Sequence, residues 1–124
     1  MHQNFNSSKL SNQIHLVQYG CGLSAPSGWR NFDSSPTLRL QRIPVLSTIL
    51  KRRFPNKKDF PIFPSNVEYG DIIKGLPIPQ ESCTAIYCSH VLEHLSYSDL
   101  GKALFNTYSY LQLGGIFRFV LPDL

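Results

Sequence analysis

Residues 14–22 of the chain read IHLVQYGCG, a short apolar and β-branched run that stops at a pair of glycines. A run of this kind predicts a strand over residues 14–19, followed by a tight turn at Gly20, Cys21 and Gly22. Glycine adopts positive φ at little steric cost, and it lets a backbone approach a ligand closely at the carboxyl end of a strand. The stretch therefore predicts the first strand of an α/β sheet, with a candidate binding turn at its end.

The rest of the chain alternates between strand and helix patterns. Further strands are predicted over 29–33, 67–72, 83–88 and 116–121, all short and rich in apolar or β-branched residues. Ser35 and Pro36 predict the start of a helix that Pro44 must kink or split. A second helix is predicted to begin with a cap at Ser98 and Asp99 and to end at Gly114 and Gly115, its apolar face formed by Leu100, Ala103, Leu104, Thr107, Tyr108 and Leu111. This order predicts a three-layer α/β domain around a mainly parallel five-stranded sheet.

Length and composition restrict the class of protein. The 124 residues are 42% hydrophobic, which is ordinary for one globular domain, predicted over 14–124 after a flexible polar tail over 1–13. No stretch approaches the about 20 apolar residues of a membrane helix, so the predicted location is cytoplasmic. The three cysteines have no Cys-x-x-Cys spacing. We therefore expect reduced thiols rather than a disulfide framework or a zinc ribbon.

The positive charge is concentrated in one segment. Residues 39–58 hold seven basic side chains and no acidic one, whereas the rest of the chain holds five basic and eight acidic side chains. Such a block can meet phosphates, an anionic glycan or lipid, or nucleic acid, but it is more often a solvated helix face. Phe54, Phe60 and Phe63 are the aromatic residues beside it, and we expect them to fold back onto the core. No nucleic-acid partner is predicted, because no recognition motif accompanies the block.

Asp33 strengthens the case for a ligand at the glycine turn. It ends the predicted second strand, where dinucleotide-type folds place an acid that accepts both hydroxyls of a ribose. It follows Gly22 by only 11 residues, and the chain has neither a third glycine opening a helix nor a Gly-Lys-Ser/Thr loop. Pyrophosphate binding is therefore disfavoured.

Five segments in order now point to a family: LVQYGCG (16–22), GWRNFD (28–33), LPIP (76–79), SHVLEHL (89–95) and LGGIFRFVLPDL (113–124). Together they resemble S-adenosylmethionine-dependent methyltransferases of the Rossmann-like class, and in particular a subgroup with a short first crossover that is often associated with glycan or lipid-linked sugar synthesis. The resemblance covers most of residues 14–124. It implies the strand order 3-2-1-4-5 and methyl transfer to a small-molecule or glycan-type or lipid-linked acceptor.

The resemblance also implies roles for individual positions. Gly20, Cys21 and Gly22 would lie under the methionine part of S-adenosylmethionine, and Asp33 would take its ribose hydroxyls. Asp71 and Ile72 would lie at the adenine, and Ser89 and His90 would pass close to the sulfonium and the substrate. His90, His94 and Asp123 are the candidate bases for a hydroxyl acceptor.

The end of the chain is a departure from the family, whose members continue past the fifth strand with helices and an antiparallel pair of strands. The last strand would then be an exposed edge, open to a partner chain or to self-association. The chain is accordingly expected to be a fragment, a truncated product or a chain completed by a partner. A Rossmann-like remnant without catalysis, which uses the basic segment 51–58 for partner contact, is the main alternative.

A remote alternative rests on the run from His90 to His94, which fits the inverted zinc-protease signature H-x-x-E-H. On a helix the two histidines would share a face, with Glu93 beside them. The run follows a strand directly, however, and only Asp99 and Asp123 lie downstream as carboxylates. No metal is therefore predicted.

Overall fold

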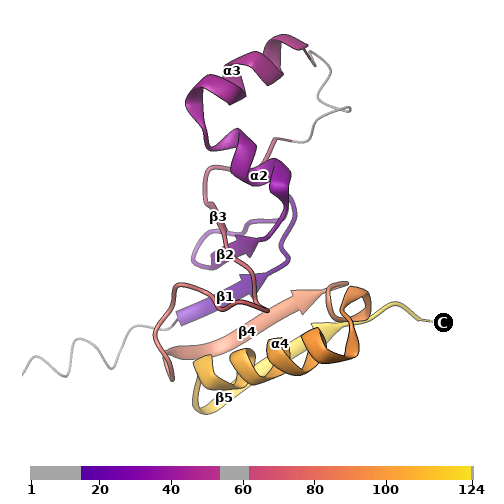
Figure 1. The fold of residues 1–124 in the computed structure, drawn as a ribbon. Coiled ribbons are helices and arrows are strands. Elements are labelled where there is room, and N and C mark those ends of the chain that lie inside the picture. Colours follow the sequence, from indigo (N-terminus) through magenta and orange to yellow (C-terminus); the bar gives the residue numbers. More distant parts are fainter. Residues whose placement is uncertain (1–14, 54–61, 124) are drawn as a thin grey trace, which may run out of the picture.

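The computed structural model describes residues 15–53 and 62–123, and the predicted tail over 1–13 lies outside them. Its centre is a five-stranded sheet in the order β3-β2-β1-β4-β5, in which every neighbouring pair is parallel. The strands are β1 (His15–Tyr19), β2 (Arg30–Asp33), β3 (Val67–Tyr69), β4 (Cys83–Ser89) and β5 (Leu111–Val120). The predicted Rossmann-like α/β fold and strand order are confirmed (Figure 1).

The helix α4 (Tyr97–Tyr110) covers one face of the sheet beside β4 and β5 (Figure 1). Its buried side chains, Ala103, Thr107 and Tyr110, face a core that includes Val17, Tyr19, Phe32, Ile86 and Cys88. Tyr19 and Thr107 join the two layers through a hydrogen bond of 3.1 Å between their hydroxyls. Residues that pair across neighbouring parallel strands point to the same face of the sheet. The core under α4 is therefore formed by the strand residues that point to this face.

The opposite face is covered at its β3 end by the short helix α2 (Pro36–Gln41). Leu38 of α2 is fully buried against Val67 of β3, together with Cys21 and Phe63. The predicted burial of Phe63 is thus confirmed, whereas Phe54 and Phe60 lie outside the described residues. A second helix, α3 (Pro44–Arg53), follows, so Pro44 splits the predicted helix as expected.

Three features of α4 and β5 correct the sequence prediction. The cap of α4 is Ser96, whose Oγ accepts a hydrogen bond of 3.1 Å from the Asp99 amide, and not Ser98 with Asp99. Leu104 and Tyr108 are exposed, because the helix buries the stripe of Ala103, Thr107 and Tyr110 instead. The helix also ends at Tyr110 rather than at the glycines.

Gly114 and Gly115 lie within β5, which begins at Leu111. Leu111 pairs with Cys83 and Ile116 pairs with Ala85, so the residues between them form an irregularity in the ladder. Gly114 has φ of +77°, and a Cβ on Gly115 would lie 3.0 Å from the Cys83 carbonyl oxygen. The glycines therefore let β5 bulge instead of ending the helix. The strand β3 is also shorter than the predicted 67–72.

The connection after β4 contains a 3-10 turn, η1 (Leu92–His94), in the region between β4 and α4. Its Leu92 is buried in the core. β5 is an edge of the described sheet, with Leu113 and Ile116 largely exposed. No described helix is long and apolar enough to cross a membrane.

Candidate functional site

The glycine turn after β1 has the predicted conformation. Gly20 and Gly22 have φ of +64° and +57°, in a region that residues with a side chain rarely adopt. A Cβ on Gly20 would collide with the side chain of Val91, which follows β4. At Gly22 a Cβ would meet no atom within 4 Å. Gly20 therefore lets the segment after β4 close on the turn, and Gly22 faces open space.

The carboxylate of Asp33 fixes this turn to the end of β2. Its Oδ2 accepts a hydrogen bond of 2.8 Å from the Gly22 amide, and its Oδ1 accepts one of 2.8 Å from the Ser35 amide. A carboxylate oxygen has two lone pairs, so each oxygen retains one for a further donor. Gly22, in the turn after β1, and Asp33, at the end of β2, are thus in direct contact. Asp33 remains able to accept two hydroxyls.

The side chain of Cys21, between the glycines, points away from this open space. It is only 6% exposed, packs with Leu38, Phe63 and Val67, and donates to the Gly22 carbonyl at 3.4 Å. Burial, with a smaller effect of the Asp33 charge, raises the pKa of its thiol to about 11. Only the backbone of Cys21 can therefore contact a ligand at the turn.

Cys83 and Cys88 are also buried, and burial raises the pKa of both thiols. Burial likewise raises the pKa of the Tyr19 hydroxyl, which packs among them. All three cysteines are free in the structure. Thiols held neutral in a core are poor nucleophiles and poor metal ligands.

The loop after β3 holds the two residues assigned to the adenine, and they differ in position. Asp71 is half-buried, and its Oδ1 accepts a hydrogen bond of 2.9 Å from the Ile73 amide. Ile72 is 5% exposed, and its side chain belongs to the main core. Asn106 of α4, which the sequence analysis missed, donates to the Ile72 and Ile73 carbonyls at 2.7 and 3.2 Å. Nothing in the sequence indicated this role, because Asn106 lies in the middle of a predicted helix and outside every motif.

The carboxyl end of β4 places Ser89 and His90 at the same edge of the sheet. Ser89 is half-buried and ends the strand. His90 has φ of +55°, a left-handed conformation that is uncommon for a residue with a side chain, and its amide donates to the Val120 carbonyl at 2.9 Å. Strained residues of this kind concentrate at functional sites, where the surrounding structure maintains them.

Glu93 lies between the two histidines that were named as candidate bases. Its Oε1 is 3.6 Å from His90 Nδ1 and 3.6 Å from His94 Nε2. Both imidazoles are more than half exposed, whereas the Glu93 side chain is 22% exposed. Asp123 is exposed beyond β5, and no hydrogen bond or ion pair joins it to the histidines in the described part of the chain.

These residues do not form a metal site. Among residues 15–53 and 62–123, no three histidine, cysteine, aspartate or glutamate side chains are arranged to hold a metal ion. The histidines share one carboxylate, but a catalytic zinc needs three protein ligands. The zinc hydrolase alternative therefore has no support in the described structure.

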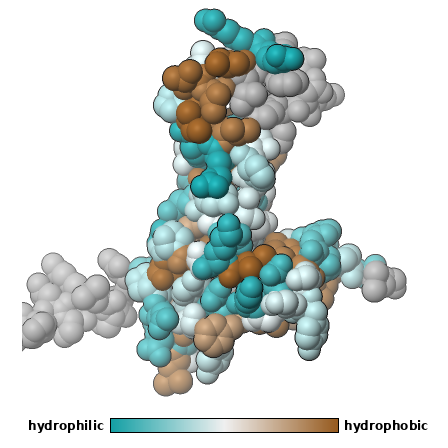
Figure 2. Space-filling view, viewed as in Figure 1, coloured by the Kyte–Doolittle hydropathy of each residue, from teal (hydrophilic) through white to brown (hydrophobic). Residues whose placement is uncertain are grey.

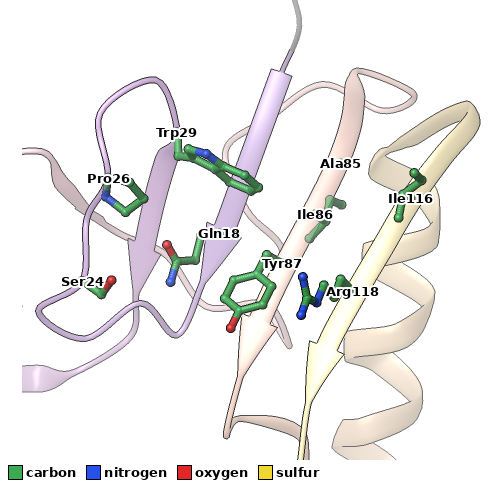
Figure 3. A pocket seen from close by; sticks show the side chains of 9 residues that line it. All are labelled: Gln18, Ser24, Pro26, Trp29, Ala85, Ile86, Tyr87, Ile116 and Arg118. Atoms are coloured by element: carbon green, nitrogen blue, oxygen red, sulfur yellow. The ribbon is translucent and has the colours of Figure 1, made fainter.

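A hollow of about 460 Å³ lies on the sheet face opposite α4, where the described part of the β1–β2 connection contains no helix (Figure 3). Gln18, Tyr87 and Arg118 are register partners on neighbouring strands, and they stand side by side along its floor. Trp29 and Pro26 of the β1–β2 loop border it (Figure 3). The sequence analysis missed this row, because only the strand register brings its members together.

Comparison with known proteins identifies the family. Residues 17–119 match the sequence family described as "Methyltransferase domain". This chain belongs to that family. The predicted resemblance to Rossmann-like S-adenosylmethionine-dependent methyltransferases is confirmed.

Solved structures share the methyltransferase fold at low sequence identity. An S-adenosylmethionine-dependent methyltransferase from Mesorhizobium loti has a TM-score of 0.52 at 23% identity, with 86% of this chain and 45% of that chain covered. The PH0226 protein from Pyrococcus horikoshii has a TM-score of 0.55 at 14% identity, with 90% and 50% covered. The glycopeptide N-methyltransferase MtfA complexed with S-adenosylmethionine has a TM-score of 0.51 at 12% identity, with 90% and 48% covered.

The methyltransferase domain described here spans about half the length of these solved structures. No curated protein matches the chain. The methyltransferase family supports S-adenosylmethionine as the cofactor.

Proposed function

We propose that this domain binds S-adenosylmethionine at the carboxyl end of its sheet and transfers the methyl group to a small-molecule or glycan-type or lipid-linked acceptor. The observation that carries the proposal is the contact between Asp33 and the Gly22 amide, which joins the acid and the glycine turn into one element. The family match adds the reaction class.

The residues present fit the cofactor in chemistry and in space. Asp33 has one free lone pair on each oxygen for the two ribose hydroxyls, and Gly22 leaves open space above the turn. Asp71 supplies a carboxylate for the exocyclic amine of adenine from the loop after β3. The contribution of Cys21 is limited to its backbone, because its thiol is buried. Ile72 contributes through its place in the core, which holds the Asp71 loop.

Bound there, the cofactor supplies an activated methyl group on a cationic sulfur. The nearby carboxylates Asp33 and Asp71 favour a cation without phosphates. Ser89 ends β4 and His90 follows it at the same edge, and both would lie close to the sulfonium and the acceptor. Positioning of the two reactants supplies most of the rate in a transfer of this kind.

A hydroxyl acceptor also needs a base, and His90 is the best placed of the three candidates. Its Nδ1 faces Glu93, which leaves Nε2 to take the proton of the acceptor. His94 has the same neighbour but is further exposed. Asp123 lacks such a partner among the described residues.

Calorimetric titration with S-adenosylmethionine and S-adenosylhomocysteine tests the cofactor site. We expect micromolar binding by the wild-type chain and a loss of about 100-fold in Asp33→Asn, because two hydrogen bonds to a charged acceptor are weakened. Asp99→Asn, at the start of α4, is the matched control and should bind normally. A folded chain that binds neither compound, or that binds them equally well after Asp33→Asn, would contradict the proposal.

An assay of methyl transfer distinguishes the non-catalytic alternative from the proposed enzyme. A chain that binds the cofactor with Asp33 dependence, but transfers no labelled methyl group to a panel of sugar and lipid-linked hydroxyl acceptors, would be a binding domain only. Loss of transfer in His90→Gln with unchanged cofactor affinity would identify His90 as the base.

A further inference from the structure

The helix α3 exposes its apolar side chains instead of burying them. Val45 is 70% exposed, Ile49 is 53% exposed and Leu46 is 36% exposed. Figure 1 shows α3 at the end of the molecule furthest from β5, and Figure 2 shows a hydrophobic region over this end. No α3 side chain whose burial is described is buried in the protein.

The same helix ends in a cluster of cations. Lys51, Arg52 and Arg53 form its last turn and are fully on the surface. No acidic residue occurs between Asp33 and Asp59 in the sequence. None of the three cations has an ion pair with any residue in the described part of the chain. Within the described residues the cluster is therefore not neutralised, and it follows the exposed aliphatic residues in the helix.

Other basic residues of this region hold it in place. Arg42, between α2 and α3, donates to the Pro64 and Val67 carbonyls at 2.7 and 2.8 Å. The Arg39 guanidinium lies 4.5 Å from the centre of the Tyr69 ring. These contacts fix the end of α2 to β3. The helix α3, which follows, therefore starts from a fixed position at the outer end of the molecule.

The chemistry of α3 favours one partner class. A helix that combines exposed aliphatic residues with lysine and arginine is typical of a segment that lies in a membrane interface. A single-stranded nucleic acid would be expected to meet stacking aromatic residues, and α3 contains no aromatic residue. A second copy docked through the same face would bring two cationic clusters together, since a two-fold interface pairs identical patches.

We propose that α3 docks this protein on the surface of an anionic lipid bilayer. Val45, Leu46 and Ile49 enter the boundary between headgroups and acyl chains, and Lys51, Arg52 and Arg53 bind the anionic headgroups. Binding at an interface needs no membrane-spanning helix. The inference does not depend on the proposed methyl transfer.

Co-sedimentation of the full chain with lipid vesicles tests the inference. We expect binding to vesicles of phosphatidylcholine with about one third phosphatidylserine, weak binding to phosphatidylcholine alone, and release at about 0.5 M salt. Replacing Lys51, Arg52 and Arg53 together by Ala should lower the partition coefficient on the order of 100-fold. Val45→Ser with Ile49→Ser should lower it about tenfold or more.

Matched substitutions on α4 provide the control. Phe105→Ser and Lys102→Ala remove an exposed apolar residue and an exposed cation from α4, and both variants should bind vesicles like the wild type. Circular dichroism should show that all variants remain folded, because each changed residue is on the surface. The inference is overturned if the α3 variants bind as tightly as the wild type or if the wild type does not bind. It is also overturned if sedimentation without lipid shows a self-association that Val45→Ser abolishes and the vesicles do not bind.

Discussion

The helices α4 and α3 differ in how they place their apolar side chains: α4 buries them against the sheet, whereas α3 exposes them. α4 has 14 residues, a serine cap that forms its hydrogen bond, and the buried residues Ala103, Thr107 and Tyr110. α3 has 10 residues and no described buried side chain, although its sequence is also rich in aliphatic residues. Because an isolated helix this short is marginal in water, packing decides which of the two supports the fold.

This difference in burial gives the two helices different roles: α4 stabilises the fold, and α3 determines the chemistry of the surface. Tyr110 of α4 packs in the main core, and its hydroxyl is bonded to the Leu76 amide at 2.8 Å. That contact ties α4 to the loop that also carries Asp71. Residues of α4 therefore support the sheet and the candidate site, whereas residues of α3 are free to meet a partner.

The largest expected contrast comes from truncating one residue in each helix. Tyr110→Ala should lower the free energy of unfolding by about 4 kcal/mol, because it removes a buried ring and leaves a cavity. Ile49→Ala should change it by less than about 0.5 kcal/mol, because Ile49 is half exposed. Urea unfolding followed by circular dichroism measures both. Equal losses in the two variants would show that α3 packs as firmly as α4.

A smaller effect is expected from removing only the Tyr110 hydroxyl. Tyr110→Phe keeps the ring but leaves the buried Leu76 amide without an acceptor. We expect a loss of about 2 kcal/mol in the free energy of unfolding. Tyr108→Phe, on the exposed side of α4, is the control and should be neutral. A neutral Tyr110→Phe would mean that water or another group replaces the hydroxyl.

The helix caps allow a finer comparison between the two sides of the sheet. Ser96→Ala should cost about 1 kcal/mol, because its Oγ accepts from the Asp99 amide. Ser35→Ala should cost only a few tenths, because Ser35 forms no cap bond to α2 through its side chain. Thermal unfolding of the two variants checks this order. A larger loss for Ser35→Ala would contradict the assignment of the caps.

The smallest expected difference is kinetic and concerns the thiols. Cys21 lies in the small cluster under α2, whereas Cys83 and Cys88 lie in the main core under α4. Smaller clusters open more readily, so Cys21 should react first with a thiol reagent under native conditions. Its rate should rise with pH towards 11, since the thiol must ionise to react and burial raises its pKa to about 11. Mass spectrometry of the labelled peptides identifies the order, and first labelling of Cys83 would refute it.

Local patterns in the sequence predicted most of the fold and part of the site. The apolar run before Gly20 predicted the first strand and its turn, and the position of Asp33 after the next predicted strand indicated an acid at the same edge of the sheet. The strand order was predicted from the family resemblance and not from these local patterns. The end of α4 was predicted wrongly, since two glycines suit a β-bulge as well as a helix end. The cap was misplaced by two residues for a similar reason, because Ser96 and Ser98 are both able to cap a helix.

What the sequence by itself determined is the alternation of strands and helices and the glycine turn, which follow from residue type and short spacing, and the family, which follows from the resemblance of five segments in order. Only the tertiary structure decided which apolar residues are buried, since Ala103 and Val45 both occur on apolar helix stripes but only one faces the sheet. It also decided the long-range contacts, such as Asn106 on the Ile72 carbonyl and the row of Gln18, Tyr87 and Arg118. The physical reason is that burial and register depend on how distant segments pack together, and no local spacing encodes that arrangement.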